Sequence, residues 1–161
     1  MSNDLKVHFL KALKADPDFS EAHFQLAILF YEENDNKNAE KHFKSAIASD
    51  KSQASKFTNR GENLLTKNQF HNAKDQFVKS QEKKNHCSVI NYHLSTLYIK
   101  ENKLNKAQNC LQESIELNPG YALSHRNLGI LLSQQKNYDD ARLHIEKSID
   151  LDYSDSLSHL H

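Results

Sequence analysis

Apolar and small side chains recur along this chain every 34 residues. One column of the repeat is alanine throughout, at Ala39, Ala73, Ala107 and Ala141. A second column holds large apolar side chains, at Phe43, Phe77, Leu111 and Ile145. A third holds only small ones, at Ala46, Ser80, Ser114 and Ser148. Columns that keep one register over four periods predict a repeat architecture with units 20–53, 54–87, 88–121 and 122–155.

Within each unit the apolar positions fall on two helical faces. With Ser20 as position 1, positions 4, 7, 8 and 11 lie within about 100° of arc at 100° per residue, and positions 20, 24, 27 and 28 form a second such face. Each unit is therefore predicted to be a helix-turn-helix, and the chain all-α. The turns contain Asn34, Asn68 and Asn102, a residue type that tolerates the left-handed backbone after a helix end.

The pattern resembles that of the tetratricopeptide repeat (TPR) family, W-x2-L-G-x2-Y…A-x3-F…P. The segments "HFQLAILF" and "AEKHF" match it in the first unit, and "HRNLGILL" and "ARLHI" match it in the fourth. The Trp position is filled instead by His23, Phe57, Asn91 and His125. The Pro position is proline only at Pro17 and Pro119. The resemblance implies an all-α, right-handed helical solenoid with four full units.

Both ends of the chain extend this register. Residues 2–15 fit the second helix of a preceding unit, so 1–19 form an N-terminal half unit, and 156–161 begin a further helix. We therefore expect one solenoid over residues 1–161. Neither end carries the polar capping helix that terminal repeats normally need. We expect either a segment of a longer protein or self-association through the uncapped ends.

Composition narrows the classes of function. Lys plus Arg equals Asp plus Glu at 21 each, so no overall positive charge indicates nucleic acid. No apolar run approaches the ~18 residues that cross a membrane. Cys87 and Cys110 lack a CxxC partner motif, which favours free thiols in a reducing compartment. We expect a cytoplasmic protein with no nucleic-acid partner and no membrane insertion.

Charge is uneven between the units. Residues 54–87 carry seven Lys and Arg against three Asp and Glu, a net charge of +4. This unit also has the weakest core positions, with Arg60 where other units have Leu, and Gln81 on the second helix. Three interpretations stay open: a solvated face, a locally labile joint, or a surface for an acidic partner.

No motif in the chain indicates catalysis or a cofactor. A Gly-rich phosphate loop, GxSxG and HExxH are all absent from the sequence. His8, His42 and His144 share position 23, so they recur along the solenoid at spacings on the order of 10 Å, too far apart for zinc ligands at ~2.0–2.1 Å. His23 and His125 are expected to pack and to satisfy a nearby polar group. We expect no enzyme activity, no metal site and no cofactor.

The exposed face of each first helix is the candidate binding surface. The resemblance implies that this face lines a concave groove for a peptide. The groove positions are Phe24, Gln25, Ile28, Tyr31, Thr58, Asn59, Glu62, Tyr92, His93, Thr96, Arg126, Asn127 and Ile130. Position 6 holds Gln25, Asn59, His93 and Asn127, which all donate and accept hydrogen bonds. This column resembles the asparagine ladder in the TPR segment of O-GlcNAc transferases.

The leading hypothesis is a protein-protein interaction module, an adaptor or scaffold that binds a peptide or partner segment in the groove. One alternative is the substrate-presenting arm of a larger enzyme, such as a glycosyltransferase or sulfotransferase. Another is a self-assembling structural solenoid. The family's carboxylate-clamp subtype, which captures chaperone tails, does not fit, because Phe24, Ile28 and Val89 occupy positions where it needs Lys or Asn.

Overall fold

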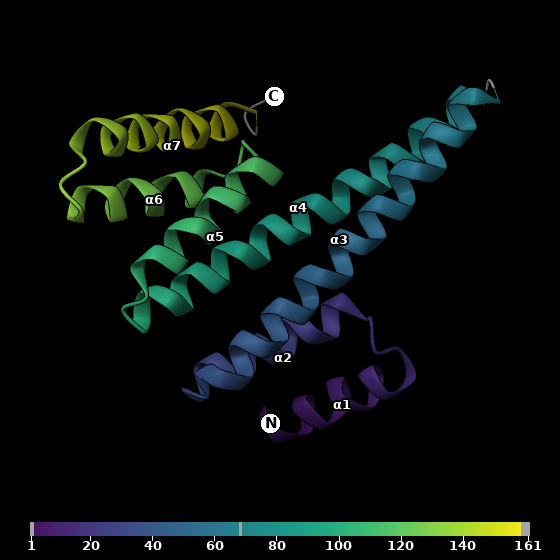
Figure 1. Cartoon of the computed structure of the whole chain (residues 1–161), viewed down its shortest axis with the longest axis horizontal. Coiled ribbons are helices and arrows are strands. Elements are labelled where there is room, and N and C mark those ends of the chain that lie inside the picture. The colour runs from purple at the N-terminus through teal and green to yellow at the C-terminus, as the bar shows by residue number, and fades with distance from the viewer. Residues whose placement is uncertain (1, 68, 159–161) are drawn as a thin grey trace. The chain divides into compact units, whose positions relative to one another are not determined.

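The computed structural model describes residues 2–67 and 69–158, and every regular element in this part of the chain is an α-helix (Figure 1). The helices are α1 (Ser2–Ala15), α2 (Ser20–Glu32), α3 (Asn36–Thr66), α4 (Phe70–Lys100), α5 (Leu104–Leu117), α6 (Ala122–Gln134) and α7 (Tyr138–Ser158). The predicted all-α fold of helical repeats is confirmed.

The turns inside the repeats share one geometry. Asn34 and Asn102 adopt left-handed backbone, with φ of 62° and 57°, as the sequence predicts. The amide of the next residue then bonds back across the turn, from Asp35 to the Phe30 carbonyl at 2.9 Å. In the fourth repeat the left-handed residue is Lys136, at φ 63°. These bonds satisfy carbonyl groups that would otherwise be orphaned at the helix ends.

Two of the links between repeats differ from expectation, because they are helical. α3 and α4 pass through the first and second repeat boundaries without a break. The repeat position that holds Pro17 and Pro119 holds Lys51 and Asn85 at these two links. Proline lacks an amide hydrogen and disfavours helical backbone in the residue before it, so the chain turns there. Lys and Asn impose neither restriction, and the helices continue.

The chain divides into two compact units, residues 1–90 and 91–161. The first contains α1, α2, α3 and most of α4, and the second contains the end of α4 with α5, α6 and α7. α7 continues to Ser158, past the fourth repeat's predicted end at Asp155, and 159–161 of the predicted further helix lie outside the described residues. The assignment of 1–161 to one solenoid stays a prediction.

In the first unit, α2 packs against the first half of α3. The buried side chains of α2 include Ala22, Leu26 and Ala27, and those of α3 include Ala39, Phe43, Ala46 and Ile47. The alanines at repeat positions 8, 20 and 27 let the two helix axes approach closely. Six of the eight core positions predicted from periodicity are therefore buried in this repeat, while His23 and Phe30 are half-buried.

The second unit buries most of the corresponding positions of the third and fourth repeats, but Ile145 is half-buried and Ile149, at position 28, is 61% exposed. The buried positions include Leu94, Tyr98, Ala107, Leu111, Leu128, Leu132 and Ala141. α6 approaches α7 closely at Gly129, since a Cβ atom there would lie 2.8 Å from Ile145 Cδ1 and 3.0 Å from the Ala141 carbonyl oxygen.

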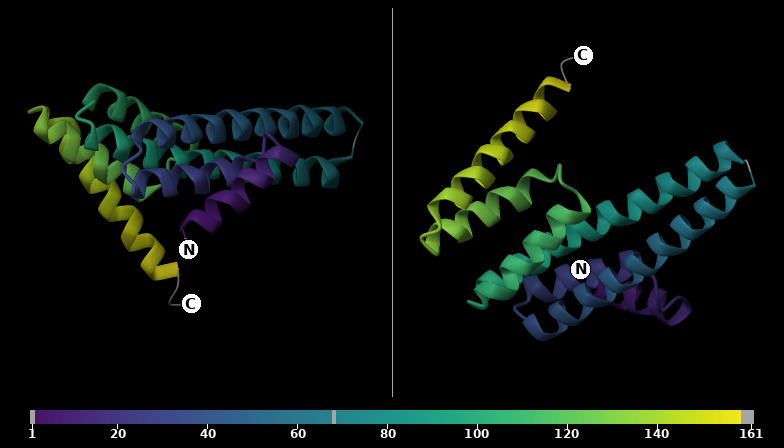
Figure 2. Two further views of the ribbon diagram at one scale, coloured as in Figure 1. Left: turned by 90° about the horizontal axis from the view of Figure 1, so that it is seen from below. Right: turned by 45° about the horizontal axis from the view of Figure 1, so that its top comes forward.

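The second repeat forms an antiparallel helical hairpin, defined as residues 54–83, whose two helices run side by side up to Thr66 and from Phe70 (Figures 1 and 2). Ser80 donates a hydrogen bond of 3.0 Å to the Ala54 carbonyl, and its hydroxyl lies 2.8 Å from that of Thr58. Arg60 and Gln81 are exposed although they occupy core positions of the repeat. The hairpin thus has a thin core, as its sequence indicates.

Among residues 2–67 and 69–158, no helix has both the length and the apolar character needed to cross a membrane.

Candidate binding cleft

A cleft of about 280 Å³ lies between the end of α4 and α6 in the second unit. α4 contributes Thr96 and Ile99, and α6 contributes Asn127, Ile130, Leu131 and Gln134. The opposite faces of the two helices carry the buried residues Leu94 and Leu128. The amphipathic pattern that buries one face of each helix therefore turns the other faces toward this cleft.

The cleft is lined by apolar side chains at different depths. Leu131 is almost fully buried, whereas Ile99 and Ile130 are 38% and 48% exposed. Two partly exposed isoleucines and a buried leucine in one cleft offer an apolar surface to one side chain of a ligand. Burial of that ligand side chain would contribute roughly 1.5–3 kcal/mol.

Polar groups accompany this apolar surface. Thr96 donates its hydroxyl hydrogen to the His93 carbonyl at 2.7 Å, which leaves the hydroxyl oxygen able to accept. Neither Asn127 nor Gln134 hydrogen-bonds through its side chain to another residue in the described part of the chain. Each amide can donate and accept, so the two match the alternating groups of a peptide backbone.

Tyr92, His93 and Arg126, also predicted for the groove, lie near the cleft in sequence but do not line it. The Tyr92 ring packs edge-on against Tyr121, with ring centroids 5.6 Å apart, and against His93 at 5.3 Å. Burial lowers the pKa of His93, which favours its neutral form. Arg126 is exposed on α6. The two aromatic residues are therefore packing residues in this structure.

The predicted residues on α2 are placed differently. The Phe24 ring packs against Phe43 and His86, with centroids 6.2 Å and 5.5 Å away. Gln25 donates a hydrogen bond of 2.6 Å to Glu21 on its own helix. Ile28 and Tyr31 are half-buried on the same helix. None of these side chains lines the cleft.

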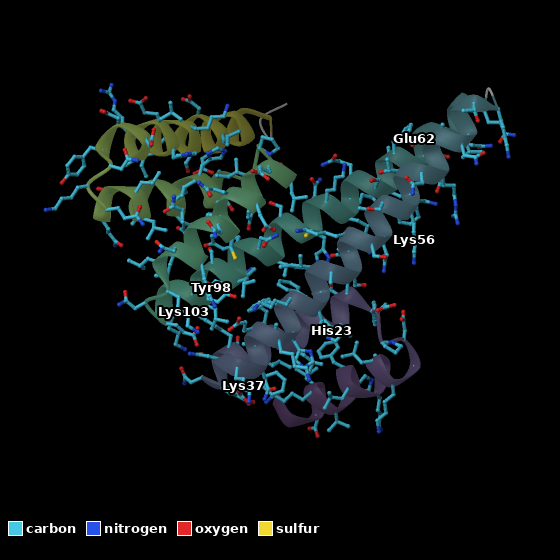
Figure 3. The ribbon with its side chains drawn as sticks, viewed as in Figure 1. His23, Lys37, Lys56, Glu62, Tyr98 and Lys103 are labelled. Atoms are coloured by element: carbon cyan, nitrogen blue, oxygen red, sulfur yellow. The ribbon has the colours of Figure 1, made fainter. Side chains whose placement is uncertain are left out.

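The remaining predicted residues belong to the hairpin. Thr58 faces α4, because its hydroxyl contacts the Ala54 carbonyl and Ser80. Asn59 lines a separate hollow, and Glu62 is exposed (Figure 3). The predicted position-6 column is divided between the two units of the chain, because Gln25 and Asn59 belong to residues 1–90 whereas His93 and Asn127 belong to residues 91–161.

Comparisons with known proteins define the family. One model, described as tetratricopeptide repeat, matches residues 8–69 and 110–143, and a second with the same description matches 89–121. The chain belongs to the tetratricopeptide repeat family. Membership of the TPR family supports a protein-interaction module as its general role.

A curated relative of this TPR chain is the type IV pilus assembly protein PilF of Pseudomonas aeruginosa. The two are 26% identical over 139 residues, which cover 85% of this chain and 55% of PilF. The chain thus spans about half the length of this relative. Similar solved structures include MamA, at 18% identity and TM-score 0.43 over 92% of this chain and 86% of that chain. Another is Pseudomonas aeruginosa pilF, at 24% identity and TM-score 0.41, covering 92% and 68%.

Two TPR units contain matching histidine pairs. His23 and His42 approach at 2.8 Å between Nδ1 atoms, and His125 and His144 at 3.0 Å. His23 Nε2 also lies 3.0 Å from the Pro17 carbonyl, and His125 Nε2 lies 3.0 Å from that of Pro119. His23 and His125 thus satisfy nearby polar groups, as predicted. In the described part of the chain, no three His, Cys, Asp or Glu side chains are placed to hold a metal ion.

A buried charge cluster in the first unit was not predicted. Asp50 of α3 is 0% exposed, and its Oδ2 lies 2.6 Å from His86 Nδ1. Lys83 Nζ lies 3.5 Å from Asp50 Oδ1, and Glu21 lies 3.3 Å from His86 Nε2. The hydrogen bond to Asp50 raises the pKa of His86, against the opposing effect of burial. Asp50 and His86 are 36 residues apart, so helical periodicity gives no signal of the pairing.

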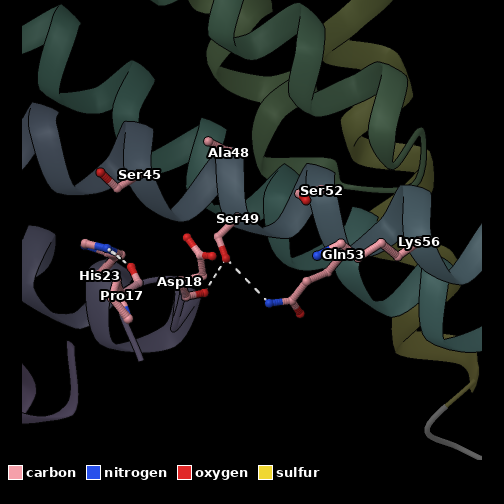
Figure 4. Close-up of a pocket in the computed structure, with 9 residues that line it drawn as sticks. All are labelled: Pro17, Asp18, His23, Ser45, Ala48, Ser49, Ser52, Gln53 and Lys56. Atoms are coloured by element: carbon pink, nitrogen blue, oxygen red, sulfur yellow. Dashed lines mark hydrogen bonds between the residues drawn. The ribbon is translucent and has the colours of Figure 1, made fainter. Parts of the chain in front are cut away.

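A second hollow, of about 320 Å³, lies between the loop after α1 and α3 (Figure 4). Ser49 donates a hydrogen bond to the Asp18 carbonyl, and Gln53 contacts the Ser49 hydroxyl at 3.5 Å. His23 and Lys56 complete the wall on either side. The polar groups of this hollow bond largely to one another, so it is a weaker candidate for binding than the α4–α6 cleft.

Proposed function

We propose that this TPR chain is an adaptor or scaffold that binds an extended peptide of a partner protein in the α4–α6 cleft. The observation that carries the proposal is the combination of Ile99, Ile130 and Leu131 with the Asn127 and Gln134 amides at one site. Apolar contact supplies affinity for one ligand side chain, and the amides orient the ligand backbone.

The cleft favours a peptide with one medium-sized apolar residue. Its volume of about 280 Å³ lies just below the ~300–1,000 Å³ of small-molecule pockets, which suits a side chain rather than a whole cofactor. The flanking amides carry no charge, so they favour an extended peptide backbone and do not select for a positively or negatively charged ligand. We expect moderate affinity, because the ligand must be ordered on binding.

The curated relative supports a scaffold role. PilF is described as a type IV pilus assembly protein. We propose that the present chain likewise contributes to the assembly of a larger complex by holding a segment of one component.

A peptide-display screen tests the proposal. The wild-type chain is immobilised and exposed to a random library of short linear peptides, and the enriched sequences are measured individually by calorimetry. Ile130→Asp should weaken binding at least about fivefold, since a carboxylate would enter the apolar part of the cleft at a cost of about 1–3 kcal/mol. Asn127→Ala should weaken binding by about 0.5–1.5 kcal/mol, the net contribution of one hydrogen bond.

Asn59→Ala is the matched control. It makes the same change at the same repeat position, but on the hairpin and outside the cleft. Affinity should be unchanged in this variant, and circular dichroism should show equal helix content in all three. Equal losses in Asn59→Ala and Asn127→Ala, or peptides that bind Ile130→Asp as tightly as wild type, would contradict the proposal.

A further inference from the structure

The first helix of the hairpin carries a basic stripe, defined as Lys56, Arg60, Asn63 and Lys67. These residues are spaced i, i+4, i+7 and i+11, so they lie within about 60° of arc at 3.6 residues per turn. All four are exposed. The face of this helix that packs on α4, at Ala54 and Thr58, is directed away from the stripe.

The basic stripe coincides with a hollow on the surface of the hairpin. Arg60, Asn63 and Lys67 line it together with Asn59 and Leu64, and its volume is about 460 Å³. Figure 3 shows Lys56 and Glu62 on this part of the chain. The acidic Glu62 lies about 120° from the centre of the stripe at 100° per residue, so it does not neutralise the stripe.

An acidic stripe runs along α7, defined as Asp139, Leu143, Glu146 and Asp150. It has the same i, i+4, i+7, i+11 spacing and covers about 60° of arc. Its four residues are exposed, Leu143 at 64%. The buried residues of this helix, Ala141 and Ser148, lie on the opposite face.

We infer that the basic stripe of the hairpin binds the acidic stripe of α7 on a second copy of this chain. In an antiparallel alignment the two spacings mirror each other. Lys56 then meets Asp150, Arg60 meets Glu146 and Lys67 meets Asp139, while Leu143 lies over the hollow beside Leu64. A parallel alignment would place Arg60 against Leu143 and lose one of the three charge pairs. No residue of either stripe lines the α4–α6 cleft.

The contact is expected to be weak and sensitive to salt. Exposed ion pairs contribute little individually, and Glu146 already accepts a hydrogen bond of 2.8 Å from Arg142 on its own helix. Because exposed ion pairs are weak, Glu146 can leave Arg142 and pair with a basic residue of a second copy at little cost. Each copy carries both stripes, so either stripe of one copy can bind the opposite stripe of a second.

Charge reversal with mixing tests the inference on the full chain. Association of the wild type is measured by sedimentation velocity over a wide concentration range, at about 0.1 M and about 1 M salt, between which the Debye length falls from about 10 Å to about 3 Å. The first variant is Lys56→Glu/Arg60→Glu/Lys67→Glu, and the second is Asp139→Lys/Glu146→Lys/Asp150→Lys. Each alone should associate at least about tenfold more weakly than wild type, because three attractive pairs become repulsive.

Mixing the two variants should restore association, since the reversed hairpin of the first matches the reversed α7 of the second, and the unchanged α7 of the first matches the unchanged hairpin of the second. Labelled copies of the two variants should therefore form a mixed species that neither forms alone. This result identifies a second copy as the partner, because a contact within one chain cannot be restored by mixing. The neutral variant Lys56→Gln/Arg60→Gln/Lys67→Gln, which should also weaken association, replaces the first variant if charge reversal impairs folding.

Lys11→Glu/Lys14→Glu/Lys41→Glu is the matched control. It makes the same total change of charge at exposed lysines outside the stripe and should associate like wild type. The inference is overturned by a wild type that stays monomeric at every concentration, by association that survives both reversals, or by mixtures that remain as dissociated as the separate variants.

Discussion

The Nδ1 atoms of His23 and His42 lie 2.8 Å apart, and this contact determines the tautomers of both rings. The Pro17 carbonyl can only accept, so His23 donates to it through Nε2–H at 3.0 Å. The neutral His23 ring must then accept at Nδ1, and His42 donates through Nδ1–H. Each pair of this kind ties the turn before a repeat to the second helix of that repeat.

The histidine pairs predict that acid destabilises the chain. Burial, then the neighbouring His23 and Lys41, lower the pKa of His42 from 6.5 to about 4, and burial also lowers that of His144. Between about pH 6.5 and 4 the unfolded chain binds more protons than the folded chain, so this stability is present above pH 6.5 and is lost as the pH falls toward 4. Melting temperatures measured by circular dichroism from pH 7 to pH 4 should fall accordingly.

His42→Gln provides the control for this pH effect, since glutamine donates to His23 Nδ1 but does not titrate. Its melting temperature should fall less steeply with acid than that of wild type. A variant whose curve parallels the wild-type curve would show that the pair does not carry the effect. His86 acts in the opposite direction, because its raised pKa adds stability below pH 6.5 that is lost as the pH rises through the folded-state value.

The burial of Asp50 predicts that even a conservative substitution there lowers the stability of the chain. Asp50→Asn should lower the free energy of unfolding by about 1.5–3 kcal/mol, because it replaces a charge-assisted hydrogen bond to His86 and leaves Lys83 without its carboxylate. Urea unfolding measures the loss. Asp75→Asn, an exposed position on α4, should change stability by no more than about 0.5 kcal/mol. Equal effects of the two substitutions would argue against the cluster.

The close approach at Gly129 predicts that alanine is not tolerated there. The added Cβ would lie 3.0 Å from the backbone carbonyl oxygen of Ala141, which cannot move without shifting α7. Overpacking of this kind costs about 1–3 kcal/mol and should exceed the roughly 1 kcal/mol that alanine gains over glycine in a helix. Gly120→Ala is the matched control, since its Cβ meets only Asn118 Oδ1 at 3.4 Å. Chemical denaturation should separate the two variants.

The helical links predict a penalty for proline at the position where the TPR pattern expects it. Lys51→Pro should destabilise the chain by about 3 kcal/mol or more, because proline removes a hydrogen bond inside α3 and its ring clashes with the preceding turn of helix. Asn85→Pro should act similarly in α4. Thermal unfolding reports the change. Wild-type stability in Lys51→Pro would mean that the first link turns as it does at Pro17 and Pro119.

Local patterns predicted most of the helices and their buried faces. Leu26, Phe43 and Leu111 are buried because helical periodicity determines which face of each helix is apolar. The turns at Asn34 and Asn102 were predictable for a similar reason, since the left-handed backbone is a property of one residue.

The links and the site depend on contacts that a single sequence does not show. The absence of proline at Lys51 and Asn85 permits a helix but does not require one, so helical links were not predicted. Of the predicted groove residues, Thr96, Asn127 and Ile130 line the cleft. Phe24 and Thr58 instead pack within the first unit, where the continuous helix α3 changes which residues are neighbours.

A helical link also transmits rotation. Insertion of one residue near Lys51 would turn every later position of α3 by about 100° and advance it by about 1.5 Å. The basic stripe would then point in a different direction, even though its own residues were unchanged. An insertion at the turn around Gly120 would not rotate later positions in this way, because no continuous helix crosses that turn. The number of residues between Asn36 and the hairpin is therefore constrained as tightly as their identity. Single-residue deletions there should be harder to accommodate than substitutions.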